Sequence, residues 1–209
     1  AGLIAQEAAD APAVRRLAGG IQADTARMRS LVRDFLEAAA MEEGSLQLHT
    51  AEHDLAALAR SATDSLAAAA GAKRQQLTFV PAPGPLPAVR ADGERLRQVF
   101  DNLIGNALKF TPPGGVITVA PGEAAGWVYA EVRDNGPGLG PADFAKIFSP
   151  RQQLSARPTG AGEESTGLGL VIARELLALQ GGRLEVQSSP GGGAVFRVQL
   201  PAAARPGAA

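Results

Sequence analysis

Apolar residues in the first part of the chain recur at alternating steps of four and three positions. They are Leu17, Ile21, Met28, Leu31, Phe35 and Ala38. Only Asp24 interrupts the series, which predicts one long helix over residues 13–41, either in a coiled coil or bundle or with an ordinary core-facing stripe. Residues 1–9 are predicted to end a preceding helix near Pro12, so the two segments would form a helical hairpin.

Beyond residue 44, strand-like and helix-like patterns alternate along the chain. Leu46 and Leu48 alternate with polar neighbours, which predicts a strand over residues 45–50. Further strands are predicted at residues 77–80, 89–91, 116–120, 127–133, 183–187 and 194–200. Helices are predicted at residues 53–72, at 93–110 after the N-cap Asp92, near 143–147, and at 168–180. Because short glycine turns join several strand pairs, we predict an α+β fold with a mixed or antiparallel β-sheet.

Composition excludes several classes of function. Apolar residues make up 45% of the 209-residue chain but aromatic residues only 4%, so aliphatic side chains must fill a sizeable core. A net charge of −1 argues against broad electrostatic binding to nucleic acid. The chain has no cysteine, which excludes disulfides, and His49 and His53 are too few for a multi-histidine metal site. We expect both histidines to be solvated surface residues.

The predicted helix over residues 93–110 carries the first candidate for chemistry. One side of it is apolar, whereas Asn102, Asn106 and Lys109 lie four and three residues apart and therefore project together. Asparagine is unfavourable inside a helix, so a reason other than helix stability is needed. Amide oxygens suit a metal ion and an ammonium group suits phosphate oxygens, which indicates a Mg²⁺–phosphate site. The alternative is a solvated polar stripe.

Two glycine-rich segments add to this candidate. Asp134 ends an apolar strand and is followed by closely spaced glycines, which would let a ligand approach the backbone, although a simple turn has the same pattern. Residues 166–170 (Thr-Gly-Leu-Gly-Leu) open an apolar helix, and the N–H groups and dipole at a helix N-terminus attract phosphate. The segment matches neither the dinucleotide fingerprint nor the Walker loop.

In combination and in this order, the segments closely resemble the catalytic ATP-binding domain of sensor histidine kinases of two-component systems. The matching boxes are the asparagine box at residues 97–111, the first glycine box at 134–138, the phenylalanine box at 147–150, the second glycine box at 166–170 and the terminal glycine segment at 191–196. The resemblance covers about residues 45–201. Residues 17–48 also resemble the second helix of the dimerisation and phosphoacceptor hairpin.

The resemblance implies a Bergerat-type (GHKL) fold, a mixed sheet with helices on one face, and ATP and Mg²⁺ as cofactors. Asn106 would bind Mg²⁺, and Asn102 and Lys109 would contact the phosphates as catalytic residues. Phe110 would pack against adenine, and Asp134 would accept a hydrogen bond from the adenine amino group. The other implied binding residues are Gly136 and Gly138 below the purine, Phe148 as the latch of a lid over residues 141–166, and Thr166, Gly167, Leu168 and Gly169 at the end of the lid.

The implied function is that of an ATP-dependent protein-histidine kinase. Residues 45–201 would phosphorylate a histidine of the upstream hairpin, for relay to an aspartate of a response-regulator receiver domain. Residues 1–44 would be a partial hairpin that forms a homodimer, and residues 202–209 a disordered tail. The domain would be cytoplasmic, in a parent protein that is either soluble or membrane-anchored. We expect the chain to be part of a longer protein, because it begins at Ala1 without Met.

The sequence departs from the family pattern at two places. Ser165 stands where the second glycine box usually begins with glycine, and the phosphoacceptor box is absent. By the family's spacing the acceptor would precede Ala1, so this fragment is expected not to autophosphorylate. The alternatives are a non-catalytic ATP-binding pseudokinase or interaction module, and a GHKL ATP hydrolase. Hydrolysis is disfavoured because Asn102 stands where those hydrolases have a glutamate, and an amide cannot act as a general base.

Overall fold

The computed structural model describes residues 11–144, 146–149, 158–159 and 167–203. These residues form two compact units that meet in the sequence between Leu46 and Gln47. The first unit contains the helix α2 (Ala11–Glu42). The second unit contains all the other helices and strands. The predicted helix over residues 1–9 lies outside the described residues.

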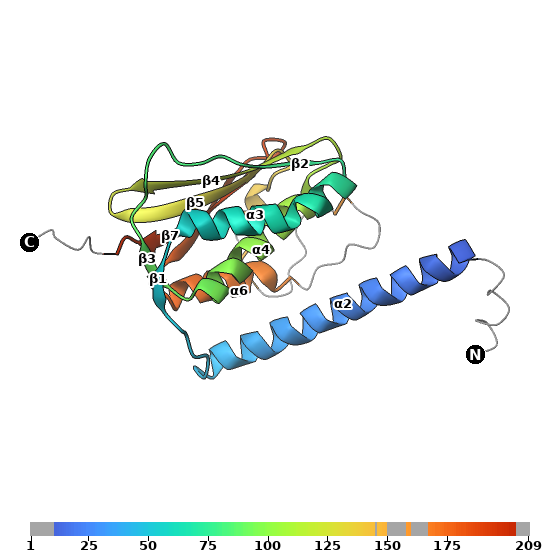
Figure 1. The fold of residues 1–209 in the computed structure, drawn as a ribbon, viewed down its shortest axis with the longest axis horizontal. Helices are drawn as coiled ribbons and strands as arrows, with labels where there is room; N and C mark the ends of the chain where they lie inside the picture. Colours follow the sequence, from blue (N-terminus) through green and yellow to red (C-terminus); the bar gives the residue numbers. More distant parts are fainter. Residues whose placement is uncertain (1–10, 145, 150–157, 160–166, 204–209) are drawn as a thin grey trace, which may run out of the picture. The chain divides into compact units, whose positions relative to one another are not determined.

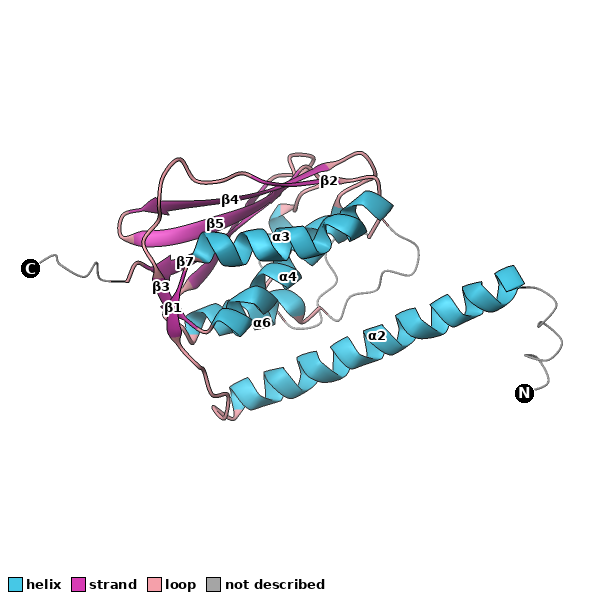
Figure 2. Cartoon of the chain, in the orientation of Figure 1, coloured by secondary structure: helices cyan, strands magenta, loops and turns pink. Residues whose placement is uncertain are grey.

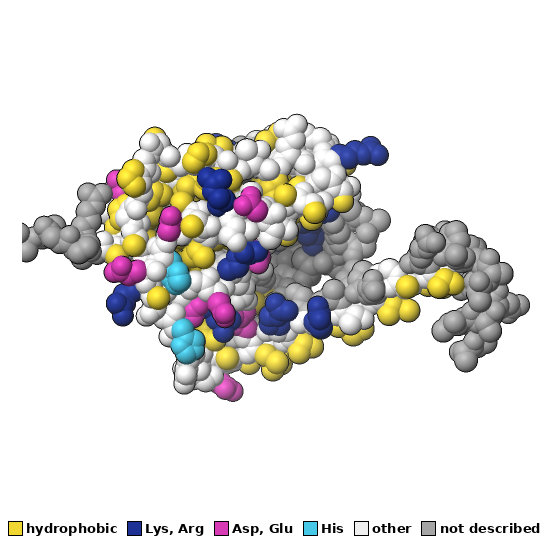
Figure 3. All heavy atoms as spheres, in the orientation of Figure 1, with side chains coloured by type: hydrophobic (Ala, Val, Ile, Leu, Met, Phe, Trp, Pro, Cys, Tyr) yellow, Lys and Arg dark blue, Asp and Glu magenta, His cyan; other side chains and the backbone are white. Residues whose placement is uncertain are grey.

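Helix α2 confirms the long helix predicted at residues 13–41. Its large apolar side chains form a row along the helix and remain exposed (Figure 3), with exposed fractions of 55% for Leu17, 67% for Ile21, 62% for Met28 and 58% for Phe35. Such a row is what a helix presents when it packs against other helices. None of the described helices is long and apolar enough to cross a membrane.

The second unit is built on a five-stranded mixed sheet with the strand order β2-β4-β5-β7-β6. The strands are β2 (Gln76–Phe79), β4 (Val116–Ala124), β5 (Trp127–Asp134), β6 (Arg183–Ser188) and β7 (Ala194–Pro201). β2 runs parallel to β4, and the other neighbours are antiparallel. A separate antiparallel pair joins β1 (Ala51–His53) to β3 (Val89–Ala91). The predicted α+β fold with a mixed sheet is confirmed.

Three helices, α3 (Leu55–Ala72), α4 (Gly93–Phe110) and α6 (Gly169–Ala178), cover one face of this sheet (Figures 1 and 2). α4 lies between α3 and α6 and contacts both. The alternation along β5 fits this arrangement, since Val128, Ala130 and Val132 are fully buried. Between β5 and α6, the described residues contain one short helix, α5 (Pro141–Phe144).

Helix α4 has the bounds predicted from the sequence, because its pattern and its cap agree. Five residues of its apolar side are 0% exposed, namely Leu96, Val99, Phe100, Leu103 and Ile104. Asp92 caps the helix, with Oδ1 accepting from Glu94 N at 3.0 Å and from Arg95 N at 3.1 Å. The helix that carries the candidate asparagines is therefore fixed along its whole apolar side and at its start.

Asp92 also joins α4 to two distant segments. Its Oδ2 accepts from the backbone N–H of His49 at 2.9 Å, and its own N–H donates to Gln180 Oε1 at 2.6 Å. Burial by itself raises the pKa of the Asp92 carboxyl, but the hydrogen bonds from the N–H groups of His49, Arg95 and Glu94 outweigh burial and lower this pKa. The carboxylate thus stabilises the entry segment and the start of α4 together.

Asp92→Ala is expected to lower the free energy of unfolding by about 2–3 kcal/mol, because it removes a helix cap and also the part-buried hydrogen bond that ties His49 of the entry segment to α4. Asp54→Ala is the matched control: Asp54 caps α3 through Ala56 N and Ala57 N but is exposed, and its loss is expected to cost about 1 kcal/mol. Urea unfolding of both variants measures the difference, and equal losses would contradict the role of Asp92 in joining segments.

The same carboxylate predicts a pH dependence. Its pKa in the folded protein is lower than the ordinary 3.8, so its contribution to stability is present above that value and is lost as the pH falls through the lowered pKa. The stability difference between the wild type and Asp92→Ala is therefore expected to shrink in acid.

Three predictions about the ends of this unit are wrong. Residues 45–50 form no strand; the strand is β1, which begins directly after them at Ala51, where β3 supplies a pairing partner. Helix α3 begins at Leu55 rather than at residue 53, and His53 is half-buried, with its ring so close to Gly93 that a Cβ there would lie 2.7 Å from it. The tail does not begin at residue 202, because Ala202 pairs with Val89 and Ala203 N donates to Ala88 O. Residues 204–209 lie outside the described residues.

Candidate functional site

The amide of Asn102 connects the first and third sequence candidates. Its Nδ2 donates to the carbonyl oxygen of Gly169 at 3.2 Å, so α4 holds the first residue of α6. A Cβ built on Gly169 would lie 3.6 Å from the Asn102 amide, so the backbone of α6 packs directly on this side chain. Gly167, just before the helix, has φ +66°, which glycine adopts without strain. The asparagine side of α4 therefore lies against the glycine turn at the start of α6.

The start of α6 has the character of an anion site. Leu168 occupies the N-cap position and makes no side-chain cap hydrogen bond, unlike Asp92 in α4. The N–H groups in the first turn of a helix and the helix dipole favour a negative charge. Asn106 is half-buried one turn after Asn102 on α4. Thr166, the remaining member of the glycine box, lies outside the described residues, as does Ser165.

Asp134 is buried at the end of β5, with an exposed fraction of 9%. Its Oδ1 accepts from Gly136 N at 2.8 Å and from Ala194 N at 3.3 Å. Burial raises the pKa of this carboxyl, and the two N–H groups oppose that rise in part. Both of these bonds end on Oδ1, and neither uses Oδ2, the second acceptor oxygen of the carboxylate.

Three glycines allow the backbone to close around Asp134. A Cβ on Gly193 (φ +74°) would collide with the carbonyl oxygen of Asp134, and a Cβ on Gly138 (φ +69°) would collide with that of Ser189. A Cβ on Gly136 would lie 2.9 Å from Asp134 Oδ1 and 3.2 Å from Phe110 O. The first glycine box thus serves close packing between β5, the end of α4 and the segment before β7.

Lys109 and Phe110 lie at the end of α4, next to this packing. Lys109 is 9% exposed, and its Nζ lies 5.5 Å from the centroid of the Phe110 ring. Phe110 is half-buried. The carbonyl of Phe110 lies beside Gly136, whose N–H donates to Asp134, so the end of α4 adjoins the segment that follows β5.

Phe148 is connected to α6 rather than left in isolation. Its ring is half-buried, and the guanidinium carbon of Arg174 lies 5.2 Å from the ring centroid. Arg174 also pairs with Glu175 at 3.0 Å. α5, which precedes Phe148, is capped by Asp143, whose Oδ2 accepts from Gly140 N at 3.1 Å. The rest of the predicted lid, residues 150–157 and 160–166, lies outside the described residues.

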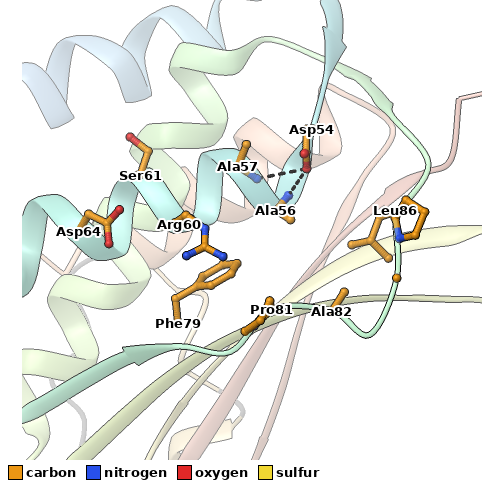
Figure 4. A pocket seen from close by; sticks show the side chains of 12 residues that line it. Asp54, Ala56, Ala57, Arg60, Ser61, Asp64, Phe79, Pro81, Ala82 and Leu86 are labelled. Carbon is orange, nitrogen blue, oxygen red and sulfur yellow. Dashed lines mark hydrogen bonds between the residues drawn. The ribbon is translucent and has the colours of Figure 1, made fainter.

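A cavity of about 460 Å³ lies elsewhere, between the first turns of α3 and the loop after β2 (Figure 4). The guanidinium of Arg60 lies over the ring of Phe79, 4.2 Å from its centroid. None of the predicted site residues lines this cavity. The candidate site is therefore the region where α4, β5 and α6 come together, because the predicted site residues that the structure describes lie on or beside these elements.

Sequence reasoning missed several contributors to the site. Ser188 accepts from Leu139 N at 2.9 Å and donates to Gly193 O. It thereby joins the loop that follows Asp134 to the turn that precedes β7. Ala194 supplies one of the two N–H groups at Asp134. The glycine segment at residues 191–196 was the signal for these contacts, but its distance of about sixty residues from Asp134 hides them. Within the described residues, no group of three or more His, Asp or Glu could hold a metal ion.

Comparison with known proteins identifies the class. Residues 91–204 match the family described as Histidine kinase-, DNA gyrase B-, and HSP90-like ATPase, and this match covers more than half of the chain. The chain therefore belongs to this ATPase family.

The relatives place it more narrowly, as the catalytic ATPase domain of a sensor histidine kinase. The adaptive-response sensory kinase SasA of Synechococcus sp. (strain CC9311) is 40% identical over 120 residues, which are 57% of this chain and 31% of that protein. The structure of full-length ShkA in complex with AMPPNP has a TM-score of 0.77 and 31% identity, over 92% of this chain and 40% of ShkA. The histidine kinase ThkA in complex with the response regulator TrrA shares the fold, with a TM-score of 0.70 and 24% identity over 93% of this chain and 53% of that one. The chain thus spans about a third to a half of these proteins.

Proposed function

We propose that residues 45–201 bind ATP with Mg²⁺ and transfer its terminal phosphoryl group to a histidine on a helical hairpin, for relay to a response-regulator aspartate. The observation that carries this proposal is the hydrogen bond between Asn102 and Gly169, because it brings the asparagine helix to the glycine turn at α6. Asp134 accepts a hydrogen bond from Gly136 N, and Gly136 lies beside the carbonyl of Phe110, the last residue of α4. A site with an anion-binding end and a buried acceptor end suits a nucleotide.

The residues divide into two groups by chemistry. At the phosphate end, the amide oxygen of Asn106 would hold Mg²⁺, which neutralises phosphate charge when bound, and Asn102, Lys109 and the 167–169 turn would orient the phosphates. At the base end, Phe110 would pack against adenine and Asp134 would accept from its amino group. Phosphoryl transfer needs mainly positioning and charge neutralisation, which these groups supply. Thr166, Gly136, Gly138 and Phe148 complete the proposed binding residues.

Hydrolysis to water is not part of the proposal. The amide of Asn102 donates to Gly169 O, and this contact positions α6. An amide also cannot take a proton from water, as the carboxylate of a hydrolase would. A domain that binds ATP without transferring it would be a non-catalytic interaction module.

Transfer with labelled ATP tests the proposal. This chain incubated with labelled ATP and Mg²⁺ is expected to form no phosphohistidine, because the backbone N–H of His49 is tied to Asp92 and the ring of His53 lies against Gly93, in β1 rather than on a hairpin. With the intact hairpin of the full-length protein added, label is expected on the hairpin histidine. Nucleotide binding without transfer would support the interaction module, and absence of binding at millimolar ATP would overturn both.

Asp134→Ala is expected to weaken ATP binding by roughly 10- to 100-fold, because it removes a charge-assisted hydrogen bond of about 1.5–3 kcal/mol. Asp134→Asn is the sharper variant. Its amide oxygen can keep the bonds from Gly136 N and Ala194 N, which turns the amide NH₂ towards the base and is expected to shift preference from ATP to GTP. Calorimetric titration with both nucleotides measures this, and an unchanged preference would contradict the placement of adenine.

We further propose that α2 takes part in a homodimer, because its apolar row is exposed. Light scattering at increasing concentration is expected to show self-association, and Ile21→Glu to abolish it without changing nucleotide affinity. A wild type that stays monomeric at every concentration would contradict this part.

A further inference from the structure

The last turn of α4 is held by side chains from outside the helix. The final carbonyls of an α-helix have no partner within it, and helices commonly close this end with a left-handed glycine. α4 ends instead at Thr111, which has an extended conformation (φ −75°, ψ 130°) and is followed by Pro112 and Pro113. Another source must therefore supply donors to the carbonyls between Leu108 and Thr111.

Gln75 is the first such source. Its side chain is buried, with 6% of the residue exposed, and its Nε2 donates to Leu108 O at 3.0 Å and to Thr111 O. Lys73 adds a third bond, from Nζ to Leu108 O at 3.1 Å. Gln75, just before β2, thus connects Leu108 in the last turn of α4 to Thr111, the C-cap residue of this helix.

Thr159 is the second source of donors. It follows α4 in the sequence, whereas Gln75 precedes it. Its backbone N–H donates to Lys109 O at 3.0 Å. Its hydroxyl oxygen lies 3.0 Å from Lys109 O and 3.1 Å from Thr111 O, so its one proton is shared between two carbonyls. Gln75 and Thr159 line the same cavity of about 270 Å³ beside Pro113, which places both donors on one side of the helix end.

We propose that Gln75 and Thr159 are positioning residues for nucleotide binding, which act by fixing the backbone of Lys109 and Phe110. This inference rests on the proposed function. The carbonyl that Thr159 holds belongs to Lys109 itself, and Phe110 lies between the two carbonyls that the hydroxyl joins. A change in this backbone would move the ammonium group and the aromatic ring together relative to Asp134. Neither Gln75 nor Thr159 needs to touch the nucleotide for this effect.

Thr159→Val removes the hydroxyl and keeps the shape and the backbone N–H. It is expected to raise the Kd for ATP about threefold to tenfold, the effect of one lost hydrogen bond. Thr159→Ser keeps the hydroxyl and is expected to bind like the wild type. Thr78→Val, at an exposed threonine of β2, is the matched control for the substitution itself. Calorimetric titration with ATP and Mg²⁺ measures all four proteins.

Two further readouts separate positioning from a general loss of structure. In transfer to the supplied hairpin, Thr159→Val is expected to raise KM for ATP with little change in kcat, because the reacting groups remain. In the Lys109→Met background, Thr159→Val is expected to have a much smaller effect on Kd than in the wild type, since the two residues act through one backbone segment. Full additivity of the two substitutions would overturn the proposal.

Gln75→Met tests the second residue, with the folded fraction checked by thermal unfolding. If this buried variant does not fold, Thr159→Val still decides the matter, because Thr159 is exposed and its variant is expected to fold. A wild type that binds ATP together with a Thr159→Val variant of equal affinity would overturn the inference and leave the proposed function intact. A wild type that does not bind ATP would overturn the proposed function instead.

Discussion

Asn106→Ala is expected to lower the rate of phosphoryl transfer to a supplied hairpin by about 10²–10³-fold, the usual effect of removing one preorganised electrostatic contact. Asn106 is half-buried one helical turn from Asn102, and in the proposed site it provides the metal-binding amide oxygen. Because Asn102 would still hold Gly169, the loss should appear in the transfer rate more than in stability. Initial rates with labelled ATP at saturating concentration measure it.

Asp101→Ala is the control on the same helix. Asp101 lies on another side of α4, where it pairs with Arg97 at 3.0 Å; its side chain is 44% exposed, and pairs this open to solvent contribute little. Its variant is expected to transfer at the rate of the wild type. If Asn106→Ala also transferred at that rate, the assignment of the metal-binding residue would be wrong.

Gly193→Ala is expected to destabilise the protein by about 2–5 kcal/mol and to weaken ATP binding at the same time. One part of the cost is the left-handed conformation, about 1–2 kcal/mol for an L-residue. The other part is the collision of the new Cβ with the carbonyl oxygen of Asp134, which forces one of two backbone segments to move. Because Asp134 is the proposed acceptor for adenine, this movement also reaches the base.

Gly191→Ala separates the two parts. Gly191 has φ +73°, nearly the same as Gly193, but no atom lies within 4 Å of the place of its Cβ. This variant is expected to carry the conformational cost alone and to bind ATP with unchanged affinity. Chemical unfolding and titration of both variants give the comparison. Equal behaviour of the two would show that the contact between Gly193 and Asp134 has no part in holding the site.

The sequence predicted best the elements whose signals are local. α4 begins and ends where predicted, because its N-cap Asp92 and its apolar spacing lie in adjacent residues. The strand predicted at residues 45–50 failed for the opposite reason: alternation of Leu46 and Leu48 is compatible with a strand, but only β1 has a partner strand, and that partner is β3, far along the chain. Strand pairing is a tertiary property that a short pattern does not contain.

The same distinction applies to the site. The asparagine and glycine segments were visible as patterns, and the hydrogen bond between Asn102 and Gly169 brings two of them together. The supports of the site were invisible, since Gln75 and Thr159 are single polar residues without a surrounding motif. Their partners are backbone carbonyls, which every residue has, so no residue type marks the far end of the contact.

The short strand β3 has a consequence for protein engineering. It pairs with β1, near the start of the ATP-binding unit, and Val89 at its start also bridges to Ala202, near the end of the described part of that unit. These two places are therefore about two strand spacings apart, roughly 10 Å. A unit with neighbouring ends can be moved between host proteins, or have its ends joined by a few residues and be reopened elsewhere as a circular permutant, without separating the strands of its main sheet.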